Sequence, residues 1–213
     1  NDEITFYGFS PGGTSLYSDA DYQSAANAAA VIARSGVGEF NSIQLPKYLN
    51  GKRAFVSPMI TERSEGISAS TTPKDLETAL QLTYLYFTAP RKDPEIFKGI
   101  IAQQKGNLAN RDSDPNSVFA DTVSAVVGSY NVRRTGPSVD KLNQINLDRA
   151  FEIYKERFAD ASDFTFTFVG SFDTATLKPL LEQYLGALPS TNRVEKAVDL
   201  GIRVPSGTIT KTV

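Results

Sequence analysis

The sequence of 213 residues contains neither cysteine nor histidine. The absence of cysteine excludes disulfides and thiol nucleophiles. The absence of histidine excludes imidazole acid–base catalysis near neutral pH, the Ser-His-Asp triad and imidazole metal ligands. Any chemistry would have to use carboxylates, lysine or tyrosine, so we expect no catalysis by this chain alone.

Strong charge of either sign and long apolar runs are also missing. The chain has 22 Lys+Arg against 24 Asp+Glu, a formal net charge of -2. A nucleic-acid surface needs a clustered basic face, which is not seen here, and no apolar run approaches the roughly 20 residues of a membrane-spanning helix. We therefore expect no nucleic-acid partner and no membrane span. With 40% hydrophobic residues, the chain can bury a sizeable core.

Apolar residues alternate in four short segments, which predicts strands. Residues 3–9 form one strand, and residues 53–60 and 62–70 read as a hairpin. The clearest strand is 163–169, where Phe164, Phe166 and Phe168 share one face. Residues 208–213 are either a final strand or the start of a linker.

Between the predicted strands, helical periodicity and capping residues predict helices. Asp19 or Asp21, Thr72 and Asn146 are expected to cap helices, and residues 129–141 are predicted to be loop. The expected helices cover residues 25–34, 42–49, 73–88, 93–110, 116–127, 147–158 and 174–185. This order predicts an α+β fold, a largely antiparallel sheet with helices packed on one face. Residues 1–190 form a single domain, and residues 191–213 are an extended C-terminal segment or a linker to a next domain.

Three local patterns could carry chemistry, but each has a simpler interpretation. The turn containing Gly12 and Gly13 lacks the lysine of a phosphate-binding loop. Asp112 with Glu95 could act as paired carboxylates of a hydrolase, yet the segment around Asp114 is typical of a helix cap. The loop pair Arg133-Arg134 could bind an anion, but a solvated loop is favoured. Tyr84 and Tyr86 are expected in the core or at an interface.

The order of several phrases resembles the pitrilysin/insulinase (M16) family of zinc peptidases. These phrases are S-P-G-G-T-S-L-Y-S-D, then A-A-N-A-A-A-V-I-A-R-S-G-V-G-E-F, and later F-E-I-Y-K-E-R-F-A-D-A-S-D-F-T-F-T-F-V-G-S-F-D. The resemblance covers about residues 4–190. It implies the same fold as the periodicity, a mostly antiparallel sheet with helices on one side.

The resemblance also implies where an active relative would hold zinc. The family motif H-x-x-E-H would fall on residues 27–31, where this chain has Asn27, Ala30 and Val31 in place of the ligands and the catalytic glutamate. The third ligand would fall near Asn107. No cofactor is therefore expected in this chain, and zinc is expected in the catalytic domain of its parent protein.

The small residues of the degenerate motif lead to a packing expectation. Ala28, Ala29 and Ala30 keep helix propensity high, so the helix should persist. Side-chain packing should fill the former metal site, with Ala30 or Val31 substantially buried.

The implied role is a non-catalytic domain, the third of four in a bacterial zinc metallopeptidase, that helps enclose the substrate. Its partners would be other domains of the same chain and a peptide or unfolded protein, in a parent for which a periplasmic location is expected. An inactive scaffold or assembly subunit with this fold is the alternative. The chain is also expected to lack the family's first strand segment, which would leave a sheet edge open for self-association.

Overall fold

The computed structural model describes residues 2–212, and its four strands form one antiparallel sheet in the order β2-β3-β1-β4. The strands are β1 (Ile4–Pro11), β2 (Ala54–Ile60), β3 (Ser64–Thr71) and β4 (Thr165–Gly170). All four confirm strands that alternation predicted, and the hairpin of β2 and β3 pairs Ala54 with Thr71 and Ile60 with Glu65. The α+β class is therefore confirmed.

Strand β1 lies in the interior of the sheet, paired with β3 on one side and β4 on the other. Gly8 leaves room there for the ring of Phe166 on β4, which would lie 2.4 Å from an added Cβ. The outer sides of β2 and β4 are the sheet edges within residues 2–212, and Pro58 in β2 suits an edge position. Any additional strand would therefore have to pair with β2 or β4. That a first strand is missing, and that an edge self-associates, stay predictions.

Eight α-helices and three short 3-10 helices connect and follow the strands in residues 2–212. The α-helices are α1 (Tyr22–Arg34), α2 (Gln44–Tyr48), α3 (Leu76–Thr88), α4 (Pro94–Leu108), α5 (Pro115–Val127), α6 (Val139–Asn143), α7 (Leu147–Phe158) and α8 (Thr174–Tyr184). The 3-10 helices are η1 (Gly13–Leu16), η2 (Pro73–Asp75) and η3 (Arg111–Ser113). Within this region, no helix combines the length and the apolar character needed to span a bilayer.

Side-chain caps fix several helix starts, although not all of the expected ones. Asn146 caps α7 as predicted. Asp21 occupies the N-cap position of α1 but makes no capping bond, because its carboxylate pairs with Arg149 at 3.0 Å. Thr72 likewise makes no capping bond. Asp93, Asp114, Ser138 and Asp173 cap α4, α5, α6 and α8.

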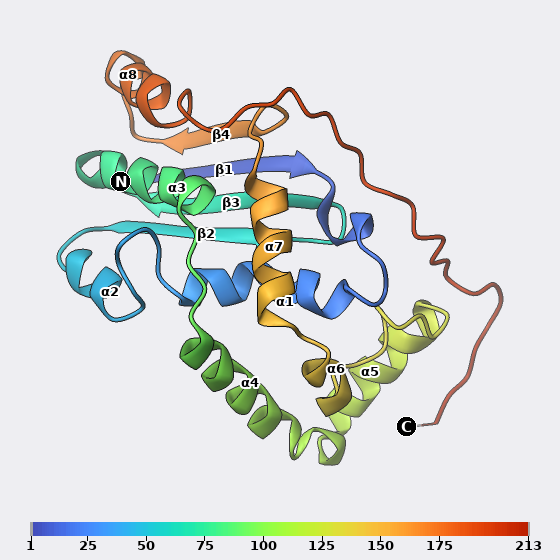
Figure 1. Cartoon of the computed structure of the whole chain (residues 1–213). Coiled ribbons are helices and arrows are strands. Elements are labelled where there is room, and N and C mark those ends of the chain that lie inside the picture. The colour runs from blue at the N-terminus through green and yellow to red at the C-terminus, as the bar shows by residue number, and fades with distance from the viewer. Residues whose placement is uncertain (1, 213) are drawn as a thin grey trace.

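The hydrophobic core lies between the sheet and helices α1, α3 and α7, which pack together on one side of it (Figure 1). Phe6 and Ile67 point into it from the strands and Ile32, Leu80 and Tyr154 from the helices, all fully buried. The periodic apolar stripes of α1 and α7 explain this packing, since the two helices pack against each other and α1 also packs against β2.

Helices α4, α5 and α6 form a second group away from the sheet, beside one end of α1 (Figure 1). The prediction that residues 129–141 are loop was wrong at its end, because Ser138 caps α6 through Lys141 N. The chain then closes with an extended segment that runs back past α5 (Figure 1). Residues 208–212 form no strand, and Val213 lies outside the described residues.

Candidate functional site

The degenerate motif lies on α1, as the resemblance implied. Val31 is buried at 2% exposure and belongs to the packed side of the helix. Ala30 is exposed, and Asn27 is half-buried, with its amide nitrogen donating to the carbonyl of Gln23 at 2.8 Å. The helix has therefore kept its place against the sheet, with only part of the motif turned inward.

Asn27 and Asn107 line the same cavity, although 80 positions separate them in the sequence. The cavity has a volume of about 290 Å³ and lies between α1, α4 and the residues around the start of α6. The expectation that packing fills the former metal site is therefore wrong on the side of Asn27. Leu108 and Leu142 form part of the wall, but polar side chains of α1 and α4 make up most of the rest and leave the space open.

No carboxylate is among the residues that line this cavity. Across residues 2–212, no group of three or more Asp or Glu side chains is placed to hold a metal ion. The motif positions and Asn107 supply amide and alkyl side chains, which are poor ligands for a zinc ion. The arrangement therefore does not fit zinc.

The other sequence candidates have structural roles. Asp114 caps α5 by accepting from the backbone N–H groups of Asn116 and Ser117, which confirms the capping interpretation. Glu95 lies in the first turn of α4 and Asp112 lies in η3, beyond the other end of that helix. The helix between them is roughly 20 Å long at 1.5 Å per residue, so they do not form a catalytic pair.

The interpretation of Arg133 as solvated was wrong. Its guanidinium is buried and donates to the carbonyls of Thr14 at 3.0 Å and Tyr17 at 2.6 Å, and to Asp19 at 2.7 Å. The neighbouring Arg134 pairs with Glu62 at 2.5 Å. Both arginines therefore fasten the loop before α6 to the first part of the domain, and neither is free for an anion.

The paired glycines form a tight turn, as predicted. Gly13 has a φ of 65°, and an added Cβ there would lie 2.4 Å from the carbonyl oxygen of Thr61. Tyr86 is buried in the core, and Tyr84 lines a small apolar cavity with Tyr48 and Tyr184.

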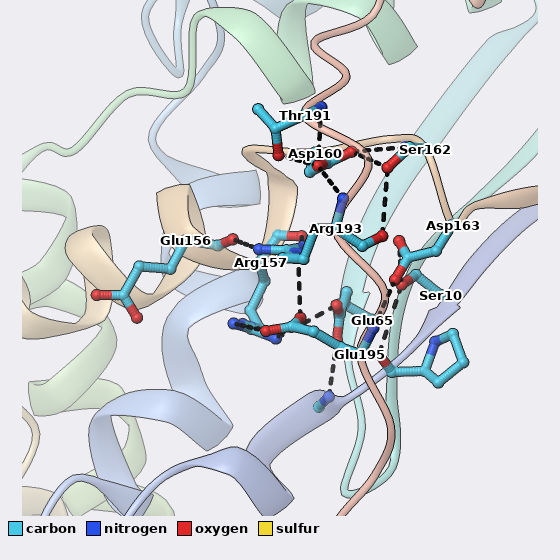
Figure 2. A network of polar contacts seen from close by, with 12 residues as sticks. Ser10, Glu65, Glu156, Arg157, Asp160, Ser162, Asp163, Thr191, Arg193 and Glu195 are labelled. Atoms are coloured by element: carbon cyan, nitrogen blue, oxygen red, sulfur yellow. Dashed lines mark hydrogen bonds and ion pairs between the residues drawn. The ribbon is translucent and has the colours of Figure 1, made fainter.

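A buried ionic cluster centred on Arg157 escaped sequence reasoning (Figure 2). Arg157 of α7 donates to both oxygens of Glu195, at 2.6 and 3.2 Å, and to the hydroxyl of Tyr17 at 2.9 Å. Its Nη1 also lies 3.6 Å from Oε1 of Glu65, whose side chain is fully buried on β3. The alternation of Glu65 with Ile67 and Ala69 was the signal that this carboxylate faces the core.

Burial dominates the electrostatics of Glu65. The loss of solvation raises the pKa of its carboxyl from an ordinary value near 4.5 to about 7, although Gly13 N–H donates to Oε2 and Arg157 lies nearby. Its Oε1 is buried and has no hydrogen-bond partner within the described part of the chain. Glu65 therefore exchanges a proton near neutral pH.

We expect Glu65 to make the stability of the domain depend on pH. Its folded-state pKa is raised, so its contribution to stability is fully present below about pH 4.5 and is lost as pH rises through 7. Between pH 5 and 8 this loss amounts to about 2 kcal/mol. Urea unfolding at the two pH values should show it in the wild type and not in Glu65→Gln.

The control for this prediction is Glu39→Gln, which changes an exposed glutamate. It should keep the full pH dependence of the wild type. Because the chain has no histidine, no side chain with an ordinary pKa titrates between pH 5 and 8. An unchanged pH dependence in Glu65→Gln would contradict the assignment.

The carboxylate of Asp160 fixes the start of the C-terminal segment (Figure 2). It accepts from the backbone N–H groups of Ser162 at 2.7 Å, Thr191 at 2.9 Å and Arg193 at 3.0 Å, and also from the hydroxyls of Ser162 and Thr191. Burial alone would raise the pKa of Asp160, but these hydrogen bonds outweigh it and hold the pKa well below its usual range. The segment after α8 is therefore anchored to the domain.

The face of the sheet opposite the core is uncovered and carries exposed apolar side chains. Tyr7 and Phe9 of β1 are each 51% exposed, Phe55 of β2 is 64% exposed and Val169 of β4 is 59% exposed. Their cross-strand partners are small: Tyr7 pairs with Ser68 and with Thr167, and Phe9 pairs with Gly66 and with Thr165. The strand residues of this face are uncharged, and the carboxylate of Glu3 accepts from the hydroxyl of Ser70 at one end of it, at 3.3 Å.

A scan against protein-family models finds no match for this chain. Among curated proteins, it is 30% identical to an Arabidopsis thaliana protein named zinc protease PQQL-like, over 192 residues that make up 89% of this chain and 17% of that protein. It is 25% identical to the probable zinc protease PqqL of Haemophilus influenzae, over 96% of this chain and 22% of that protein. The chain therefore spans about a fifth of the length of these relatives.

Solved structures agree with the sequence relatives. The periplasmic protease PqqL from Escherichia coli superposes with a TM-score of 0.78 at 20% identity, over 96% of this chain and 22% of that chain. The chain is a homologue of PqqL-like zinc proteases with an M16 peptidase fold. A peptidase M16 inactive domain from Pseudomonas fluorescens matches this M16-type domain with a TM-score of 0.68 at 14% identity, over 92% of this chain and 49% of that one.

Proposed function

We propose that this M16-type domain is a non-catalytic part of a longer zinc metallopeptidase and helps to form the chamber that encloses the substrate. The uncovered sheet face carries this proposal. Its aromatic side chains lie among small, uncharged strand residues that are mostly hydroxyl-bearing, which suits contact with unfolded peptide of varied sequence. The zinc and the catalytic residues would belong to another domain of the same protein, since the relatives are named zinc proteases.

The wider setting of the proposal follows from the relatives. The chain would be the third domain of a bacterial enzyme with residues 191–213 leading to the next domain, and a periplasmic location is supported by the Escherichia coli structure. An inactive scaffold subunit remains the second candidate, supported by the solved inactive M16 domain. An H-x-x-E-H motif in the same open reading frame would favour the first over the second.

Site-specific photo-crosslinking in the full-length parent tests the chamber. A photoreactive phenylalanine analogue would replace Tyr7 or Phe9, and zinc would be removed by chelation so that a fluorescein-labelled extended peptide is held without cleavage. We expect peptide adducts at both positions, because the uncovered face would line the chamber.

The matched control places the same analogue at Tyr130, which is 59% exposed and whose backbone N–H donates to the carbonyl of Ala125 in α5. Helix α5 lies away from the sheet (Figure 1). This position should give no adduct. Equal labelling at Tyr130 and Tyr7, or labelling at Tyr130 alone, would contradict the proposal that the sheet face lines the chamber.

A further inference from the structure

The cavity between α1 and α4 has the character of a small binding site. Its volume of about 290 Å³ lies at the lower limit of ordinary ligand pockets, which start near 300 Å³. Apolar side chains form part of its wall, with a few polar groups between them, as in most ligand pockets. The polar lining residues are Gln23, Asn27, Gln104, Asn107, Ser138 and Lys141.

The side-chain amides around this cavity are largely unused by the fold. Oε1 of Gln104 is buried without a hydrogen-bond partner among residues 2–212. Within the same residues, the side chains of Gln23 and Asn107 make no hydrogen bond, and only the nitrogen of Asn27 is engaged. Leaving a buried acceptor without a donor costs free energy, so a ligand that supplies an N–H group would gain by entering.

The charged group at the cavity is already satisfied. The ammonium of Lys141 donates to the carbonyls of Thr135 at 2.6 Å and Gly136 at 2.9 Å, and to the hydroxyl of Thr135 at 2.6 Å. Its three donors are therefore taken. With no carboxylate in the lining, the cavity offers neutral donors and acceptors and no free charge to an ion.

We propose that this cavity binds the backbone amides of a peptide, one or two residues at a time. A peptide amide both donates and accepts, which matches Gln104 and Asn107 on α4 and Gln23 and Asn27 on α1. The inference rests on the proposed function, because it makes the peptide substrate the ligand. The domain would then hold substrate at the positions where the family resemblance places a metal ion.

NMR titration of the 213-residue chain with the capped dipeptide N-acetyl-Gly-Gly-amide tests this site. We expect amide shift changes concentrated at residues 104–108 and 138–142 and around Asn27. Acetate and glycerol, titrated in the same way, separate amide recognition from binding of an anion or a polyol. Both should give at least tenfold weaker effects, since acetate has no donor for Gln104 and glycerol lacks the planar amide that donates on one side and accepts on the other.

Gln104→Leu should weaken dipeptide binding about tenfold, as expected for the loss of one hydrogen-bonding amide. Gln103→Leu is the matched control, because the same change on the same helix removes an exposed amide that only contacts Arg34. Equal weakening by both variants, equal binding of acetate, or no shifts at the cavity would overturn the proposal. That result would leave the sheet face unaffected, since Tyr7 and Phe9 are tested separately.

Discussion

Replacing Arg157 by methionine should lower the free energy of unfolding by about 3–5 kcal/mol. Arg157 is 5% exposed, and its guanidinium is the only cation among residues 2–212 that lies within 4 Å of Glu65. Its removal would leave Glu65 and the hydroxyl of Tyr17 buried without this partner, and would free Glu195 from α7. Chemical denaturation at pH 8, where Glu65 is ionised, measures the effect.

A second substitution separates charge from packing in this prediction. In the Arg157→Met background, Glu65→Gln should recover part of the lost stability, because it removes the unpaired buried charge. Arg149→Met is the control on the same helix, since that arginine is 32% exposed at its side chain and should contribute less than about 1 kcal/mol. Equal losses in the two arginine variants would contradict a special role for the buried cluster.

The second large effect is expected at Asp160. Asp160→Asn should cost about 2–4 kcal/mol, because an amide nitrogen would replace an oxygen that accepts two or three hydrogen bonds. It should also release the segment that begins at Thr191, so trypsin should cleave after Arg193 faster than in the wild type. Unfolding curves and limited proteolysis followed by mass spectrometry provide the measurements.

Asp112→Asn is the control for Asp160→Asn, because Asp112 is exposed and makes no hydrogen bond through its side chain in the described residues. The effects of the two substitutions on stability should also depend differently on pH. Because the pKa of Asp160 is depressed in the folded state, its carboxylate stabilises the domain at pH values above the unfolded-state pKa near 3.9. This contribution is lost as the pH falls through the lower folded-state pKa. Unchanged proteolysis in Asp160→Asn would show that other contacts hold the segment.

Local sequence patterns were sufficient to predict most of the helices and strands. The alternation of Phe164, Phe166 and Phe168 predicted β4, and Asn146 predicted the start of α7, because both signals act within a few residues. The failures lie where side chains found distant partners. Asp21 pairs with Arg149 and makes no capping bond, and Arg133 became buried because carbonyls of residues 14 and 17 accept from it.

The sequence by itself determined the class of fold and the missing chemistry. Without histidine and cysteine there is no imidazole or thiolate to bind zinc, and this follows from composition whatever the fold. Only the tertiary structure decided that Asn27 and Asn107 share a cavity and that Arg157 joins Glu65 to Glu195. Periodicity records which side of an element is buried, but the partner across a contact depends on how the elements pack, and no local pattern encodes that.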